Sequence, residues 1–251
     1  MRDRLRGQGM NLVGAVDASA FDAAQPSCRR TGAWLDGADT VLLFGSGGRA
    51  AFGEVVDQNG GELQKPTPGY HPIDEWSLAV ATAELERLRA DGVEGVVVQP
   101  DSRPVLNFRQ LGEMVGFGTV SPVIGHLLHP EFGPWVSLRV VILLRGRPFG
   151  ECPPRPTVDF NPCGPCKRPC VKACPAEVYA ESSIDLVRCG THRLEGGCGG
   201  GCETLRACPL GAEHRYGSEE EAFRHRYSLF GLQRWFGRGR WKLVPRRWRQ
   251  R

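Results

Sequence analysis

Eight of the ten cysteines in this 251-residue chain lie between Cys163 and Cys208. The stretch CGPCKRPCVKACP places the first four within thirteen residues and ends in a Cys-Pro pair, and a second, looser set also ends in one, Cys208-Pro209. Thiolates at such short spacing bind iron–sulfur clusters or zinc, and in an oxidising compartment thiols form disulfides. We therefore expect the chemistry of this chain to depend on these thiols.

The spacing favours iron–sulfur clusters. Three thiolates close together let a short loop wrap one face of a cubane, so that backbone N–H groups point at its sulfides. Structural zinc prefers paired Cys-x2-Cys knuckles, and only Cys163 and Cys166 have that spacing. The gap before Cys170 contains Pro169 and is one residue longer than in the bacterial ferredoxin run, which we interpret as a bulge in the wrap. We favour two [4Fe–4S] clusters, while a single cluster, zinc and a disulfide framework stay open.

The two runs resemble those of two-cluster bacterial ferredoxins, in which the fourth cysteine of each run binds the other run's cluster. This resemblance implies two ligand sets. The first set is Cys163, Cys166, Cys170 and Cys208, and the second set is Cys174, Cys189, Cys198 and Cys202. His192 lies inside the second run and could replace a ligand. Cys28 and Cys152 stand apart, and we expect neither to bind metal.

The composition is that of a globular chain with an acidic body and a basic end. Hydrophobic residues make up 41% and charged residues 24%, so a core of normal size is expected. Residues 222–251 hold ten Lys and Arg and no Asp or Glu, and subtracting ten from the net charge of +4 leaves −6 for the rest. This aromatic, basic tail is suited to contact an acidic partner or a membrane surface. The simpler interpretation is a terminal helix that packs its aromatic side chains on the body and exposes its arginines.

The chain shows no recognisable secretory signal. The apolar run in MRDRLRGQGMNLVGAV is short and is followed by Asp17. The longest apolar run, near WVSLRVVILL, contains Arg139 and is too short to span a bilayer. We therefore expect a cytoplasmic protein, and in a reducing compartment clustered cysteines are more often metal ligands than disulfides.

Strands and helices alternate in the first part of the chain. Apolar runs predict strands over 11–16, 40–45, 94–100 and 136–144, and near-helical spacing predicts helices over 75–92 and 105–116. This alternation predicts an α/β layer structure over residues 1–148. Proline and glycine then become frequent and apolar periodicity is lost, so we expect a metal-organised domain over 149–215 and a separate tail over 216–251.

Three segments are similar to epoxyqueuosine reductase and reductive dehalogenases, namely QPDSRPVLNFRQLGEMVGFG (99–118), LLHPEFGPWVSLRVVILL (127–144) and the double cysteine run. That family joins a nitroreductase-like α/β domain, which binds cobalamin, to a two-[4Fe–4S] ferredoxin-like domain. The resemblance covers about residues 10–212. It implies the same fold, of class α+β or α/β, in a divergent, ferredoxin-like member in which the basic tail stands in place of C-terminal helical repeats.

The same resemblance implies electron flow from the clusters toward a cofactor in the first domain. Asp101 falls at the position of the family's proton donor, and its alternative role is a helix N-cap. Where the family usually has Trp, Gly and Lys, this chain has GFGTVSPVIGHLL with an inserted Ser121-Pro122.

Four further residues are candidates for cofactor binding. Gly45, Gly47 and Gly48 follow a predicted strand, where a phosphate could bind at the N-terminus of the next helix, and His126 could face a cofactor. The first functional hypothesis is a ferredoxin-type protein that transfers electrons between redox proteins through two [4Fe–4S] clusters. One alternative is an oxidoreductase, a corrinoid- or flavin-dependent reductase that uses cobalamin or flavin with Asp101 as acid. The other is a zinc-organised nucleic-acid-binding module, although no specific nucleic acid is predicted.

Overall fold

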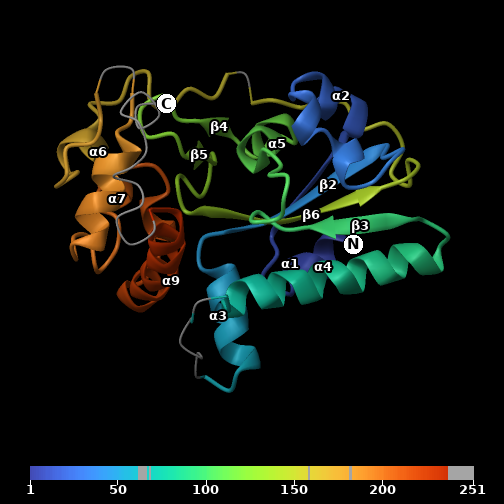
Figure 1. Ribbon diagram of the computed structural model, residues 1–251, viewed down its shortest axis with the longest axis horizontal. Coiled ribbons are helices and arrows are strands. Elements are labelled where there is room, and N and C mark those ends of the chain that lie inside the picture. Colours follow the sequence, from blue (N-terminus) through green and yellow to red (C-terminus); the bar gives the residue numbers. More distant parts are fainter. Residues whose placement is uncertain (62–66, 68, 158, 181–182, 237–251) are drawn as a thin grey trace.

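The computed structural model describes residues 1–61, 67, 69–157, 159–180 and 183–236 (Figure 1). Its helices and strands are, in chain order, α1 (Arg2–Arg6), β1 (Leu12–Asp17), α2 (Ala18–Ala23), β2 (Thr40–Gly47), α3 (Ala50–Gln58), α4 (Pro72–Ala90), β3 (Gly95–Val98), α5 (Phe108–Met114), β4 (Thr119–Val120), β5 (Leu127–Leu128), β6 (Val136–Leu144), α6 (Pro169–Lys172), α7 (Leu186–Leu194), α8 (Glu203–Arg206) and α9 (Ser218–Phe236). Short 3-10 turns occupy Ser27–Arg29, Thr31–Ala33 and Ala212–His214.

A four-stranded sheet in the order β1-β2-β6-β3 lies at the centre, and each neighbouring pair is antiparallel. The fold is therefore mixed α+β, which confirms the first of the two classes expected from the resemblance and corrects the α/β layer structure that the alternation of elements predicted. Because β2 and β3 both run opposite to β6, they are parallel to each other, and α3 and α4 connect them. The alternation of elements reflects this crossover, but β6 enters last and inserts between the two strands.

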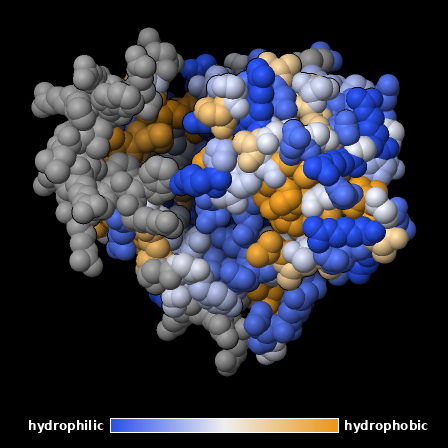
Figure 2. Space-filling model, turned by 45° about the vertical axis from the view of Figure 1, so that its right-hand side comes forward, coloured by the Kyte–Doolittle hydropathy of each residue, from blue (hydrophilic) through white to orange (hydrophobic). Residues whose placement is uncertain are grey.

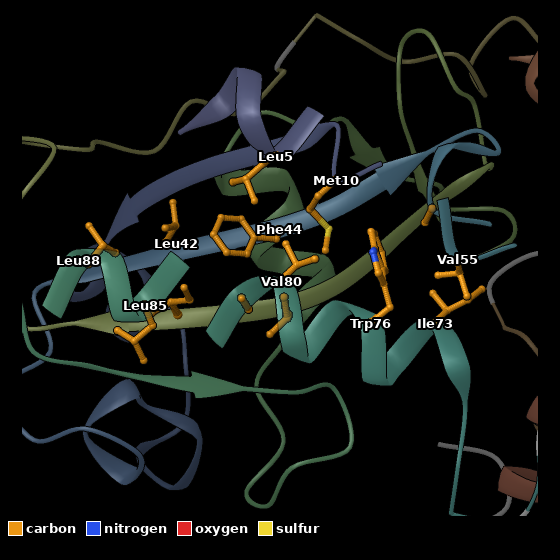
Figure 3. Packing of buried hydrophobic residues seen from close by; sticks show 14 of the residues in the cluster. Leu5, Met10, Leu42, Phe44, Val55, Ile73, Trp76, Val80, Leu85 and Leu88 are labelled. Atoms are coloured by element: carbon orange, nitrogen blue, oxygen red, sulfur yellow. The ribbon is translucent and has the colours of Figure 1, made fainter. Parts of the chain in front are cut away.

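Both faces of the sheet are covered, which explains why β2 is buried along its whole length. Leu42 and Phe44 point to one core, where they meet Trp76 and other apolar residues of α4 (Figure 3). Leu43 points to the opposite core, which includes Phe108 at the start of α5. A strand buried on both faces is expected to have a continuous apolar sequence rather than an alternating one.

Helix α9 packs against both the sheet body and the cysteine-rich segment (Figure 1). The ring centroid of Phe223 lies 5.8 Å from that of Phe52, and Tyr227 lies 4.0 Å from His71. Aromatic packing on the body is thus as the simpler interpretation expected. Arg224 does not follow that interpretation, which expected exposed arginines. Its guanidinium is mostly buried and lies 4.4 Å from the ring centroid of Tyr216.

The rest of the basic tail, residues 237–251 with Trp241 and Trp248, lies outside the described residues, so the predicted contacts of the tail with a partner or membrane stay a prediction. Among the described helices, none is long and apolar enough to cross a membrane. On the face shown in Figure 2, hydrophobic side chains form small areas between hydrophilic ones.

His71 caps α4 with a neutral imidazole. Its Nδ1 accepts a hydrogen bond from the backbone N–H of Asp74 at 3.3 Å. Burial, together with the cations Arg139 and Arg224, lowers the pKa of His71 from 6.5 to about 3. The carboxylate of Asp74 is instead paired with Arg139 at 3.0 Å.

We expect this histidine to make the fold sensitive to acid. Between about pH 6.5 and about pH 3 the unfolded chain binds a proton that folded His71 does not, so stability falls as the pH drops through this window and is constant above it. The slope from one such group is at most about 1.4 kcal/mol per pH unit. His71→Asn keeps a capping acceptor, so the fall in unfolding temperature with acid should become shallower.

Thermal unfolding followed by circular dichroism across this pH range is the measurement. His214→Asn, which makes the same change at a more exposed histidine, is the control for the loss of an imidazole. An equally steep fall in the His71 variant would assign the acid sensitivity to other groups.

Candidate metal centres

The backbone of the cysteine-rich segment is strained. In the described part of the chain, three residues other than glycine have a positive φ, namely Arg168 (55°), Glu177 (49°) and Cys198 (54°), and all three lie between Cys163 and Cys208. Such conformations cost about 1–3 kcal/mol each and tend to persist where a functional site requires them. Arg168 shows one such requirement, because its backbone N–H points to Cys166 Sγ at 3.4 Å.

The first set of thiols shares one pocket. Cys163, Cys166, Cys170 and Cys208 all line it, and its wall toward the sheet body includes Ser121 and Leu128. Burial raises the pKa of Cys170, and the neighbouring Cys208, Cys163 and Cys166 raise it further. The pKa of Cys208 is raised by burial and then by Cys163 and Cys166.

The second set behaves in the same way. Burial raises the pKa of Cys189, Arg193 opposes the shift, and Cys202, Cys174 and Cys198 add to it. The pKa of Cys198 is raised by burial and then chiefly by Cys202 and Cys174. The four thiols of the first set thus line one pocket, and those of the second set influence one another's pKa. Their assignment as two sets of cluster ligands stays a prediction.

All ten cysteines are free thiols, so the disulfide framework is not formed. In the described residues, no three His, Cys, Asp or Glu side chains converge closely enough to hold one metal ion. A cubane bonds its four thiolates to four different irons, so its ligands surround a cluster rather than a single point. Absence of a one-ion site is therefore compatible with cluster binding.

Polar atoms beside the second set fit a bound anionic group. Thr191 Oγ1 and His192 Nε2 are buried without a hydrogen-bond partner, and both follow Cys189 on α7. A Cβ atom at Gly197, which precedes Cys198, would lie 2.2 Å from His192 Nε2, so only glycine allows this approach. Buried donors of this kind normally have an acceptor, and thiolates and sulfides are acceptors.

Ser121 is a candidate site residue that the sequence did not reveal. Its hydroxyl oxygen accepts hydrogen bonds from the backbone N–H groups of Val123 and Ile124, at 3.2 and 3.1 Å. A hydroxyl accepts two hydrogen bonds and donates one, so its hydrogen is left for Cys163 Sγ, 3.2 Å away. The inserted Ser121-Pro122 indicated a turn, but nothing in the sequence pointed to a thiol 42 residues away.

The glycine candidates lie in a closely packed region. Gly45 and Gly47 belong to β2 rather than to a turn, and a Cβ atom at Gly47 would lie 2.1 Å from the ring of Phe132. The N–H of Ala51, in the first turn of α3, already donates to Ser46 Oγ at 3.1 Å. Phe132 thus packs against Gly47 and Gly48, and cofactor binding at Gly45, Gly47 and Gly48 stays a prediction.

Asp101 and His126 lie in exposed turns. Asp101 lies between β3 and α5, and it is not the cap of α5, because Asn107 Oδ1 accepts from the N–H of Gln110 at 3.2 Å. Its carboxylate adds to the raised pKa of Tyr227, behind burial and Asp74. His126 lies between β4 and β5, and its carbonyl accepts from the N–H of Ser121 at 2.8 Å.

A cavity of about 570 Å³ lies beside the first set, between α5, the turn that contains Pro122 and the segment that leads to Cys163. Cys163 is part of its lining, as is Thr157, whose hydroxyl is buried without a partner. Asp101 is not among the lining residues. A molecule in this cavity would therefore lie next to a thiol of the first set.

No protein-family model matches the chain, and no curated protein matches its sequence. Solved structures match its fold. Epoxyqueuosine reductase from Bacillus subtilis superposes with a TM-score of 0.56 at 16% identity, over 88% of this chain and 67% of the reductase. The enzyme from Streptococcus thermophilus superposes with a TM-score of 0.54 at 16% identity, over 83% of this chain and 64% of that enzyme. A catabolic reductive dehalogenase in complex with 3-bromo-4-hydroxybenzoic acid gives 0.53 at 16% identity, over 95% of this chain and 36% of the dehalogenase.

At this identity the likeness shows the fold. The resemblance seen in three sequence segments is thus confirmed at the level of fold: this chain has the mixed α+β fold of epoxyqueuosine reductases and reductive dehalogenases. It spans about two thirds of the former and about one third of the latter.

We predict that Ser121→Ala weakens both the fold and the environment of Cys163. Two backbone N–H groups lose their acceptor, which costs about 1–3 kcal/mol for a buried donor. Loss of the hydrogen bond to sulfur should also lower the reduction potential of a cluster bound there. Chemical unfolding and a redox titration of the same preparation measure the two effects.

Ser46→Ala is the matched control, since Ser46 is equally buried and accepts from one backbone N–H in the sheet body. It should reduce stability without changing the redox titration. If both variants left the titration unchanged, the hydroxyl of Ser121 would have only a structural role.

Proposed function

We propose that this protein binds two [4Fe–4S] clusters and transfers electrons between redox partners. The observation that carries the proposal is the single pocket lined by Cys163, Cys166, Cys170 and Cys208. Burial and the neighbouring thiols also raise the pKa of thiols in both proposed sets. The strained backbone at Arg168 and Cys198 supports it, as does the fold shared with oxidoreductases.

Bound clusters would supply one-electron transfer. The first set would hold one cluster against the sheet body, and the second set would hold the other farther along the same unit. Cys170 of the first set and Cys174 of the second set are only four residues apart in the chain. Groups bound by the two sets would therefore be neighbours. Cys163 faces the cavity, so the first set is the proposed exit for electrons.

This proposal assigns residues 1–148 to a nitroreductase-like domain, 149–215 to a two-cluster ferredoxin-like domain and 216–251 to a C-terminal segment. The contacts of α9 with both Phe52 and Arg193 fit a segment that joins the two domains. An acidic or membrane partner of the tail remains part of the proposal.

A second candidate is a reductase that binds cobalamin or flavin in the cavity beside Cys163. Its volume lies within the range of about 300–1,000 Å³ usual for small-molecule sites, and one structure with this fold is a reductive dehalogenase described as B12-dependent. The unpartnered hydroxyl of Thr157 would bind such a group, and Cys163 would bring it next to the first set. Electron transfer is the first proposal because Asp101, the candidate acid, does not line the cavity.

We expect anaerobically purified protein to contain about eight iron and eight sulfide per chain, the content of two cubanes. Metal and sulfide analysis, with cobalt and zinc included, tests this. Cobalt or a flavin spectrum alongside iron would support the reductase. Zinc without sulfide would contradict the redox proposal and favour a zinc-organised module, for which RNA is the first ligand to test, since one epoxyqueuosine reductase with this fold was solved with a modified tRNA stem loop.

We predict that Cys170→Ala removes about half of the iron and sulfide, because it deletes a ligand of one cluster only. The visible absorbance that remains should come from the cluster held by the second set. Cys152→Ala is the control, since Cys152 is buried to the same degree but lies outside both sets. Full iron and sulfide in the Cys170 variant would show that the ligand assignment is wrong.

A further inference from the structure

Arg193 lies between the second set of thiols and helix α9. It follows Cys189 by four residues on α7, so the two side chains lie on the same face of that helix. Burial lowers the pKa of Arg193, while Cys189, Cys202 and Cys198 each act to raise it. A cation is thus held, half-buried, beside the second set.

Helix α9 fixes the position of this guanidinium. Its Nε donates to His225 Nε2 at 3.0 Å, and its Nη2 donates to the carbonyl of His225 at 3.2 Å and to Ser228 Oγ at 2.7 Å. His225 has to be neutral to accept at Nε2. Burial, with Arg193 and Arg206, lowers its pKa to about 4, so it is neutral near pH 7.

A second arginine joins the same helix to the same loop. Arg206 on α8 donates through Nε to Glu221 of α9 at 2.6 Å and through Nη2 to the carbonyl of Gly200 at 2.6 Å. Gly200 lies between Cys198 and Cys202. Helix α9 is therefore bound at two points to the segments that carry the second set.

We propose that Arg193 sets the reduction potential of the cluster held by the second set, and that α9 controls this effect by fixing the guanidinium. This inference rests on the proposed function, since it requires a cluster there. Reduction adds one negative charge to an anionic centre, and a nearby cation stabilises the reduced form, which raises the potential. The interaction is stronger for a partly buried cation than for one in water.

The test is a redox titration of the anaerobically purified full chain, followed by electron paramagnetic resonance. Arg193→Gln should shift the potential of one cluster to a more negative value and leave the other unchanged. Arg188→Gln is the matched control, because it removes the same charge from the same helix at an exposed position, where Arg188 lies 3.5 Å from Glu177. It should cause a clearly smaller shift.

A double variant, His225→Ala with Ser228→Ala, keeps Arg193 and all eight thiols but removes the two side-chain acceptors on α9. It should shift the same cluster in the same direction, by less than Arg193→Gln. It also decides the question if Arg193→Gln loses the second cluster or fails to fold.

The outcomes separate the two proposals. Two clusters in the wild type with unchanged potentials in the Arg193 and double variants would overturn the role of Arg193 alone, as would equal shifts from Arg188 and Arg193. Wild-type protein without iron and sulfide would overturn the proposed function and this inference with it.

Discussion

The repulsion among neighbouring thiolates is the constraint on which the cysteine-rich unit depends. Burial and like charge both oppose ionisation of Cys170, Cys189, Cys198 and Cys208, yet only thiolates bind metal. The proposed clusters, with their cationic cores, would remove this penalty, and their binding would release the thiol protons. Cluster binding and ionisation of the thiols would then be one coupled process.

The two parts of the chain are stabilised in different ways. The sheet body has two large apolar cores, one on each face, which meet along β2. The cysteine-rich unit has a small core in which Ile124 and Leu128 come from the body and Cys170 is itself a proposed ligand. A unit with so little apolar burial of its own relies on the body and α9 for a fixed shape, and the proposed clusters would stabilise it further.

The sequence predicted the local features and missed the long-range ones. The apolar run over 136–144 matches β6 residue for residue, and the other predicted strands overlap β1, β2 and β3. Local patterns could not show that β6 inserts between β2 and β3, because strand order depends on pairing across 40 or more residues. Cysteine spacing predicts the two ligand sets because a cluster loop is short, so most members of each set are close in sequence.

Residues that act on the thiols from a distance left no such pattern. Ser121 lies 42 residues before Cys163, and Arg193 lies 32 residues before His225. Asp101 stood in a favourable position for a cap, yet Asn107 caps α5, since the turn after β3 extends farther than the helical periodicity suggested. Strand β2 likewise extends beyond the predicted strand over 40–45, because Ser46 and Gly47 pair with β6.

The position of β6 implies an order of assembly. This strand pairs with both β2 and β3, so the sheet is complete once residue 144 has joined it, and every residue of the two ligand sets comes later in the chain. During synthesis, domains fold as units from the N-terminal side, so the body can be formed before the first of these cysteines leaves the ribosome. Helix α9 is made last of the described elements, and it packs against both the body and the cysteine-rich segment.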